Sequence, residues 1–416
     1  MTRNLAVNPS RIAEDIDDLA AITEPDRPWT RRSFTPMFLR GREYLVRRFE
    51  AAGLETRIDA AGNLIGRRPG TRPGLGTIMV GSHSDTVPEG GRFDGIAGVS
   101  VALEVARALR DQGVRLEHDL EIIDFLAEEV SAFGISCVGS RGMTGQLKPE
   151  MLARLADERS LAAGIAEVGG APEQLSAPVR TDVRAFLELH IEQGTVLEEA
   201  HEDIGVVTAI AGITRIEIIV RGRADHAGTT RMGSRQDALV AAAWLVIAIN
   251  QWAKKKAEGP KHFAATVGEF AIEPNAANVV PSSARLLVDA RAERREDMLE
   301  FQGALAEMVR QVALDTGVPI DAPVTISDNL PTPGDPDVLD ILDAACEAVG
   351  ARHRRMASGA GHDTAWMARI AKAAMIFIPC LGGRSHSPDE WAETDDIALG
   401  AAVLLDAVRQ LDVRLG

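Results

Sequence analysis

The stretch TIMVGSHSDT, residues 77–86, decides the fold. It begins with an apolar run and ends in polar side chains that include His83 and Asp85, a pattern typical of a buried parallel strand with chemistry at its carboxyl end. Two later stretches share this pattern, DLEIIDFLAEE (119–129) and AFLELHIEQG (185–194). Because helical patterns alternate with these strands, we predict an α/β domain in which a mixed sheet is flanked by helices.

A second domain is indicated beyond the third strand. ITRIEIIVRG (213–222) alternates apolar and polar residues, as a half-exposed strand does, and two long helical patterns follow with further alternating strands. The buried α/β pattern then returns after the Pro/Gly-rich run PTPGDP. We therefore predict an inserted α+β domain at residues 212–329, within a catalytic domain formed by residues 1–211 and 330–416.

Composition limits the possible functions. A chain of 416 residues fits two domains, and 45 basic against 61 acidic residues give a net charge of −16. Such a charge disfavours nucleic acid and anionic membranes as partners. Three scattered cysteines, a polar N-terminal stretch and the lack of any span-length apolar run predict a reduced, cytoplasmic protein.

Potential metal ligands gather where the predicted strands end. In chain order they are His83, Asp85, Asp94, Glu128, Glu129, His190 and His386. Each one alone is more often a packing or surface residue, but charged groups at the ends of buried strands need partners. Imidazole nitrogen and carboxylate oxygen suit zinc or manganese. Two ions a few Å apart need a bridging carboxylate, and a catalytic pair leaves a position for water.

Eight motifs carry a family resemblance. They are SHSDT (82–86), GRFDG (91–95), AEE (127–129), LELHIEQG (187–194), ADHAGTT (224–230), NVVPS (278–282), SGAGHD (358–363) and GRSHSPDEW (383–391). In this order the chain resembles the dimetal amidohydrolases that include N-carbamoyl-L-amino-acid hydrolases, allantoate amidohydrolases and β-ureidopropionases, within the superfamily of cocatalytic metallopeptidases. The HIEQG run points to the carbamoylase group rather than to peptidases.

The resemblance implies two divalent ions per subunit, Zn²⁺ or alternatively Mn²⁺, Co²⁺ or Ni²⁺. It implies that Asp94 bridges them, that His83 and His190 complete one site, and that Glu129 and His386 complete the other. The metals would activate water and polarise the carbonyl of the substrate.

The resemblance also implies roles for residues that bind no metal. Glu128 would be the general base, Asp85 would fix the tautomer of His83, and His226 would stabilise the developing oxyanion. The implied substrate contacts are Gln193, Asn278, Arg291 and the backbone of Gly359. Gly361 stays open as an alternative to Gly359.

These implications lead to a predicted function and assembly. We expect hydrolysis of a linear ureido C–N bond in a small carboxylate-bearing substrate, an N-carbamoyl-L-amino acid or a relative such as allantoate. The inserted domain resembles the family's lid and dimerisation domain, so we expect a homodimer with a shared active site. Its strand 213–222 could pair edge to edge with its twin.

Two other functions stay open, an aminoacylase or dipeptidase on the same scaffold and a binding protein without catalysis. The chain departs from the family pattern at Arg231, where relatives often have proline, and in DARAE (289–293), which lacks a more usual basic residue. Both departures affect the expected substrate rather than the reaction type.

Overall fold

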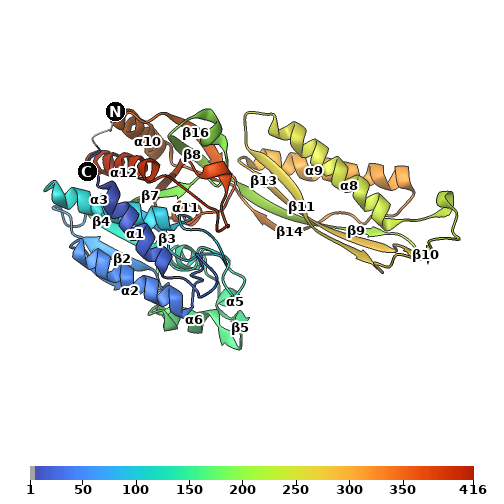
Figure 1. Ribbon diagram of the computed structural model, residues 1–416, viewed down its shortest axis with the longest axis horizontal. Coiled ribbons are helices and arrows are strands. Elements are labelled where there is room, and N and C mark those ends of the chain that lie inside the picture. Colours follow the sequence, from blue (N-terminus) through green and yellow to red (C-terminus); the bar gives the residue numbers. More distant parts are fainter. Residues whose placement is uncertain (1–4) are drawn as a thin grey trace. The chain divides into compact units, whose positions relative to one another are not determined.

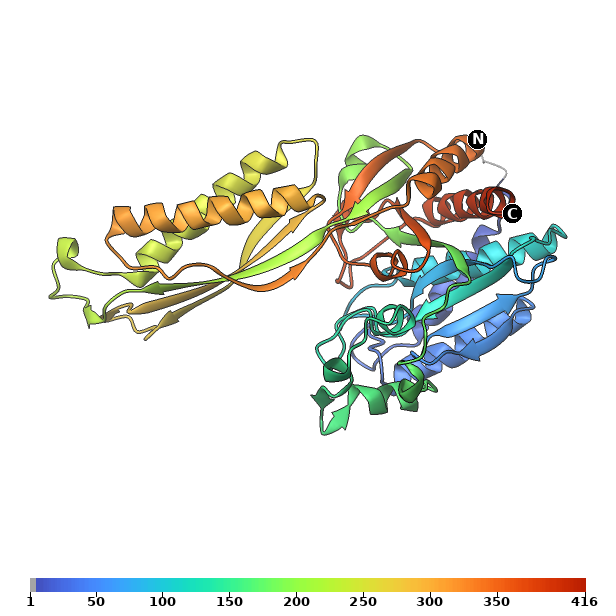
Figure 2. The ribbon, with the colours of Figure 1, turned by 180° about the vertical axis from the view of Figure 1, so that it is seen from behind.

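The computed structural model describes residues 5–416, which divide into two compact units. The first comprises the described chain up to Thr208 together with Gly334–Met356 and His362–Gly416. The second comprises Ala209–Pro333 and Ala357–Gly361. Figures 1 and 2 show the elements of each unit from two sides. In the described part of the chain, no helix combines the length and the apolar character needed to cross a membrane.

The first unit is built on a mixed sheet with the strand order β1-β2-β4-β3-β7-β17-β8-β15, in which β16 also pairs with β8. The strands are β1 (Glu55–Ile58), β2 (Leu64–Arg68), β3 (Thr77–His83), β4 (Asp119–Phe125), β7 (Val183–Ile191), β8 (Ile204–Ile210), β15 (Thr332–Pro333), β16 (His353–Ser358) and β17 (Lys372–Ile378). Of these, β15 and the last two residues of β8 and of β16 are assigned to the second unit. β3 runs parallel to β4 and to β7, and β7 runs parallel to β17. The predicted mixed sheet is therefore confirmed, and its central strands end at one edge.

Helices cover both faces of this sheet. Ile78 and Val80 of β3 face a large core formed with α1 (Pro9–Ala21), α2 (Pro36–Ala51), α3 (Ile96–Asp111), α10 (Pro336–Val349) and α12 (Thr394–Arg414). Met79 of the same strand faces the opposite side, where α4 (Val138–Met143) and α11 (Thr364–Met367) contribute Met143 and Met367. Burial on both faces explains why the central strands read as unbroken apolar runs.

Shorter elements connect these layers. They are α5 (Pro149–Leu152), α6 (Leu161–Glu167), α7 (Val196–Ala200), the strands β5 (Leu155–Ala156) and β6 (Arg159–Ser160), and the 3₁₀ turns η1 (Pro172–Gln174) and η3 (Leu381–Gly383).

The second unit is an antiparallel sheet with helices on one face (Figures 1 and 2). Its strand order is β11-β13-β9-β14. Its elements are β9 (Gly212–Arg221), β11 (Phe263–Glu273), β13 (Ser283–Ala292), β14 (Val324–Asn329), α8 (Ala238–Ala257) and α9 (Arg295–Thr316), with a small ladder of β10 (Asp225–His226) and β12 (Val279–Val280) and the turn η2 (Met232–Ser234). The inward side chains of the sheet and both helices form a separate hydrophobic core.

One expectation about this unit is wrong. We predicted that the strand at 213–222 could pair edge to edge with its twin, but β9 lies between β13 and β14, so both its edges are already paired. Alternation of apolar and polar residues reports that one face of a strand is exposed and says nothing about which strands neighbour it. Among the described residues, the edges of this sheet are β11 and β14.

The separate core of the second unit can be tested at Phe301 of α9. This ring is fully buried, 5.4 Å from the Trp252 ring and 5.5 Å from the Phe263 ring between centroids. Because truncation leaves a cavity, Phe301→Ala should lower the free energy of unfolding by about 3–5 kcal/mol in urea denaturation. Leu314→Ala on the same helix removes a side chain that is 65% exposed and should change it by less than about 0.5 kcal/mol. Equal losses in both variants would contradict this core.

Candidate metal centre

Parallel strands bring the predicted ligands to one edge of the central sheet. His83 is the last residue of β3 and lies opposite Phe125, after which β4 leads to Glu128 and Glu129. His190 lies at the end of β7, on the other side of β3. His83, Glu129 and His190 therefore lie at or just beyond the ends of strands that are buried on both faces.

Asp94 enters the site from the loop before α3. Gly95 caps this helix with a φ of 68°, a left-handed conformation that suits glycine. A Cβ atom at Gly95 would also lie 2.4 Å from the His83 ring. Both facts require glycine beside Asp94, and they allow α3 to begin directly against the histidine.

The two carboxylate oxygens of Asp94 face two different groups of side chains. Oδ1 lies 3.1 Å from His190 Nε2 and 3.5 Å from His83 Nε2. Oδ2 lies 3.3 Å from His386 Nε2, which is itself 3.1 Å from Glu129 Oε1. Within each trio, one ligand atom from every residue lies within 4.8 Å of the others. This is the arrangement that a carboxylate shared by two ions requires.

The charges around Asp94 show that these residues fit a bound cation. Burial alone would raise the pKa of Asp94, but His190, His386 and His83 hold it well below its ordinary value. Burial alone would lower the pKa of His83, but nearby carboxylates raise it well above its ordinary value. The buried acids thus demand positive charge, which the imidazoles supply as cations and which divalent ions would supply equally well.

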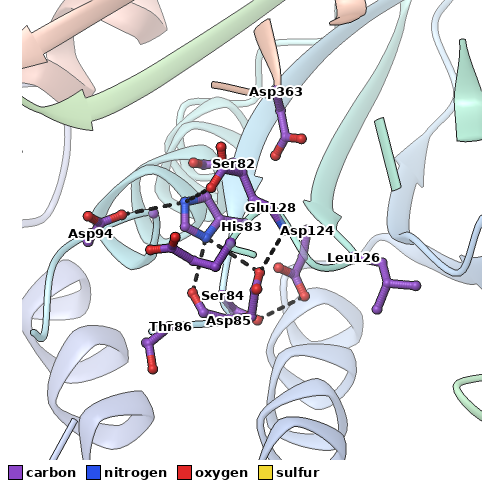
Figure 3. A network of polar contacts seen from close by, with 12 residues as sticks. Ser82, His83, Ser84, Asp85, Thr86, Asp94, Asp124, Leu126, Glu128 and Asp363 are labelled. Carbon is purple, nitrogen blue, oxygen red and sulfur yellow. Dashed lines mark hydrogen bonds and ion pairs between the residues drawn. The ribbon is translucent and has the colours of Figure 1, made fainter. Parts of the chain in front are cut away.

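Glu128 is oriented differently from Glu129. Its Oε2 lies 3.8 Å from His83 Nε2, its Oε1 accepts a hydrogen bond from the Cys137 thiol at 3.4 Å, and burial raises its pKa well above the ordinary value. The backbone N–H of Glu128 donates to Asp85 Oδ1 at 3.1 Å. Figure 3 shows Glu128, Asp85 and His83 in one network.

Asp85 contacts His83 through its main chain and its side chain. His83 Nδ1 is 3.1 Å from the carbonyl oxygen of Asp85 and 3.5 Å from its carboxylate (Figure 3). With a carbonyl acceptor nearest to Nδ1, this nitrogen carries a proton, so Nε2 is the nitrogen that would coordinate a metal. The contact with the backbone carbonyl of Asp85 could not be predicted from the pattern of side chains in the sequence.

Three contacts of Asp94 were not predicted. Gln193, expected at the substrate, donates from Nε2 to Asp94 Oδ2 at 2.8 Å. Ser385 Oγ also lies 2.7 Å from Oδ2, and the Glu390 carboxylate accepts the backbone N–H of Asp94 at 3.0 Å. Burial and the charge of Asp94 raise the pKa of Glu390 to about 7. The signal that could have found Ser385 and Glu390 is their position on either side of His386 in GRSHSPDEW.

His226 belongs to the second unit, in a turn that fixes its ring. The strand β10 pairs His226 with Val279 of β12. The ring Nδ1 accepts hydrogen bonds from the backbone N–H groups of Gly228 at 3.0 Å and Thr229 at 3.2 Å. Because Nδ1 is an acceptor, the proton of the neutral ring lies on Nε2, so this exposed histidine presents a hydrogen-bond donor.

The other predicted substrate contacts also lie in the second unit. Arg291 on β13 donates from Nε to Asp289 at 2.8 Å and from Nη1 to the carbonyl oxygen of Gly359 at 2.8 Å. A Cβ atom at Gly359 would lie 2.9 Å from His262 Nε2, whereas one at Gly361 would meet nothing within 4 Å. Gly359 is thus the glycine whose small size matters. Asn278 is exposed, and its backbone carbonyl accepts the N–H of Ala227 at 3.0 Å.

Comparisons with known proteins identify the family. Residues 79–410 match the model described as peptidase family M20/M25/M40. The chain belongs to this family. It is 39% identical to an N-carbamoyl-L-amino-acid amidohydrolase of Paenarthrobacter aurescens over 97% of this chain and 98% of that protein. It is 36% identical to a ureidoglycolate hydrolase of Oryza sativa over 98% and 86%, respectively.

A solved structure agrees with the M20 assignment. A hydantoinase/carbamoylase family amidase from Burkholderia multivorans is 34% identical, with a TM-score of 0.89 over 96% of this chain and 97% of that chain. The predicted resemblance, the fold class and the assignment to hydrolases of C–N bonds outside peptides are therefore confirmed.

The contacts of His386 in this M20 chain predict a pH-dependent stability. Hydrogen bonds to Asp94 and Glu129 raise the pKa of His386 from 6.5 to about 10. A raised pKa adds stability that is fully present below the ordinary value and is lost as the pH rises through about 10. In metal-free protein, the Tm difference between wild type and His386→Gln should therefore shrink between about pH 6 and about pH 10.5 in calorimetry. A difference that stays constant across this range would contradict the ion pairs.

Proposed function

We propose that this chain is a dimetal amidohydrolase that cleaves the ureido C–N bond of an N-carbamoyl-L-amino acid, or of a related ureido acid such as allantoate. Such a reaction consumes water and releases ammonia, carbon dioxide and the amino compound. One observation carries the proposal: one oxygen of Asp94 faces His83 and His190, and the other faces the pair of His386 and Glu129, so that Asp94 belongs to two trios of metal-type ligands. The names of the relatives support the ureido substrate.

In this proposal each ion has a defined set of ligands. His83, His190 and Asp94 would hold one ion, and Asp94, Glu129 and His386 would hold the other. Zn²⁺, Mn²⁺, Co²⁺ or Ni²⁺ suits imidazole and carboxylate donors. When bound, the ions supply Lewis-acid polarisation of the carbonyl and activation of water.

Glu128 moves the proton. It lies beside the ligands without belonging to either trio, and burial raises its pKa, which makes the carboxylate a better proton acceptor. Glu128 would take a proton from the attacking water and pass it to the leaving nitrogen. The Cys137 thiol and the Asp85 carboxylate, which accepts the N–H of Glu128, hold this residue in place for both transfers.

The second unit binds and orients the substrate. The Nε2–H of His226 would donate to the oxygen that becomes negative in the transition state. Arg291, Asn278 and the backbone N–H of Gly359 would hold the substrate carboxylate, with Gln193 as a further contact. Since Arg291 is anchored through Nε and Nη1, its remaining Nη2 is the group that a carboxylate meets.

We further propose that the first unit is the metal-binding catalytic domain and that the second serves as lid and dimerisation domain of a homodimer. Helix α8 exposes Val240, Trp244 and Ile247 at 47%, 48% and 55%, one helical stripe of apolar side chains. The neighbouring strand β11 is an edge of its sheet. A second copy would cover both features. A reducing, cytoplasmic setting is supported by three buried free thiols.

The reaction can be tested with a substrate panel. Ammonia release should be measured from N-carbamoyl-L-amino acids and allantoate, and acyl or peptide cleavage from N-acetyl amino acids and dipeptides. We expect ammonia release that chelation abolishes and that Zn²⁺, Mn²⁺, Co²⁺ or Ni²⁺ restores. Cleavage of the acyl compounds alone would favour an aminoacylase or dipeptidase, and no turnover would favour a binding protein. Full activity in protein shown by elemental analysis to be metal-free would disprove the dimetal scheme.

Mutation should distinguish the roles of the two adjacent glutamates, Glu128 and Glu129. Glu128→Gln removes a proton acceptor and no ligand, so kcat should fall by roughly 10²–10⁴-fold while two ions per chain remain. Glu129→Gln is its matched control, because the same substitution one residue later should lose metal. Elemental analysis of both variants decides the roles, and metal loss in Glu128→Gln alone would reverse them.

Mixing two inactive variants should show whether the active site is shared between subunits. Glu128→Ala and His226→Ala are each expected to be inactive. If His226 acts on the partner's metals, a mixed dimer has one intact site, and random mixing of equal amounts should restore about a quarter of all sites. Glu128→Ala mixed with Glu129→Ala is the control that should restore nothing, because both defects lie in one unit. Mixed dimers that mass spectrometry detects but that stay inactive would place His226 within its own subunit.

A further inference from the structure

A buried glutamate joins the two loops that carry Asp94 and His386. Glu390 is 2% exposed, and its Oε1 accepts the backbone N–H groups of Phe93 at 2.7 Å and Asp94 at 3.0 Å. Its Oε2 lies 3.1 Å from the hydroxyl of Ser385, the residue before His386. One side chain therefore contacts the main chain of one loop and a side chain of the other.

The same hydrogen-bond network includes Oδ2 of Asp94. Ser385 Oγ lies 2.7 Å from Asp94 Oδ2, and Gln193 Nε2 lies 2.8 Å from Asp94 Oδ2 and 3.1 Å from Ser385 Oγ. Oδ2 is the oxygen that faces His386. The orientation of the Asp94 carboxylate toward the second trio therefore depends on side chains tied to Glu390.

Packing around Glu390 is close. A Cβ atom at Gly91 would lie 2.4 Å from the Glu390 carboxylate, so this loop is shaped around it. On the following residue, the Trp391 ring packs edge to face against Phe93 at 5.4 Å, and Arg92 lies over Trp391 at 5.4 Å. The contacts leave little room for Glu390 to move independently of the two loops.

His386 needs such support more than the other histidines do. His83 and His190 end buried strands, whereas the His386 side chain is 49% exposed on a loop and its backbone has a φ of 53°. We propose that Glu390 is a positioning residue that assembles the second metal subsite, formed by Asp94, Glu129 and His386, and leaves the first subsite largely independent of it. This inference rests on the proposed dimetal function.

The experiment compares Glu390→Ala, Glu390→Gln and Ser385→Ala with wild type. Metal content is measured by elemental analysis, and the affinity for each Zn²⁺ by competition with a chromogenic chelator. We expect Glu390→Ala to bind the second ion roughly 10- to 100-fold more weakly and the first ion as wild type does. Ser385→Ala should show the same selective loss. Glutamine offers an oxygen to the two amides and an N–H to Ser385, so Glu390→Gln should retain both ions.

Asp412→Ala is the matched control. Asp412 is also a buried carboxylate, and it accepts the successive backbone N–H groups of Glu117 and His118 at 2.9 Å each, in a region without metal-type ligands from either trio. Asp412→Ala should lower Tm, and the variant should still bind two ions with the affinities of wild type. A role of Glu390 in general stability alone would give the same result as this control.

Hydrogen exchange of the metal-free protein provides a second measurement that does not depend on metal. Peptides covering residues 384–391 and the amides of Phe93 and Asp94 should exchange faster in Glu390→Ala than in wild type or Asp412→Ala. The inference is overturned if Glu390→Ala keeps both affinities, or if both ions weaken equally. If wild type itself binds no ions, the dimetal function fails, and unchanged exchange in Glu390→Ala would then overturn the positioning role as well.

Discussion

Mutual repulsion among buried carboxylates is the constraint on which the rest of this structure depends. Asp85, Asp94, Glu128 and Glu129 converge where parallel strands end, in a region with little solvent. Burying charge in this way is unfavourable unless partners compensate it. The imidazoles of His83, His190 and His386 compensate this charge. Asp94 lies between them, with Oδ1 facing His83 and His190 and Oδ2 facing His386.

Much of this arrangement follows from sequence, because it is local to strands whose pattern is plain. An apolar run such as residues 77–83 has to be buried on both faces, and parallel neighbours then bring His83, Glu128 and His190 to one edge. Contacts made by backbone groups and by loops were not predictable in this way. The carbonyl of Asp85 at His83 and the carboxylate of Glu390 at the Asp94 main chain leave no periodic signal.

The second unit shows where reasoning from patterns fails and where it succeeds. Alternation correctly indicated that β9 is half exposed, but strand order depends on pairings between distant segments, and β9 proved to be an inner strand. The orientation of His226 was beyond prediction for the opposite reason. It depends on two N–H groups within three residues, whose direction is set by the conformation of a turn rather than by residue type.

The contact between Glu390 and the loop of Asp94 has a consequence for biosynthesis. It joins residues almost 300 positions apart in the chain, with a separation of 297 to Phe93 and 296 to Asp94. The strands that carry His83 and Glu128 leave the ribosome long before residue 390 does, but the core against which they pack also includes α12, which follows residue 390. Because a domain generally folds as a unit, the sheet and its metal-type ligands come together only when nearly the whole chain has been made. A chain truncated before residue 390 would lack both this contact and the α12 part of the core.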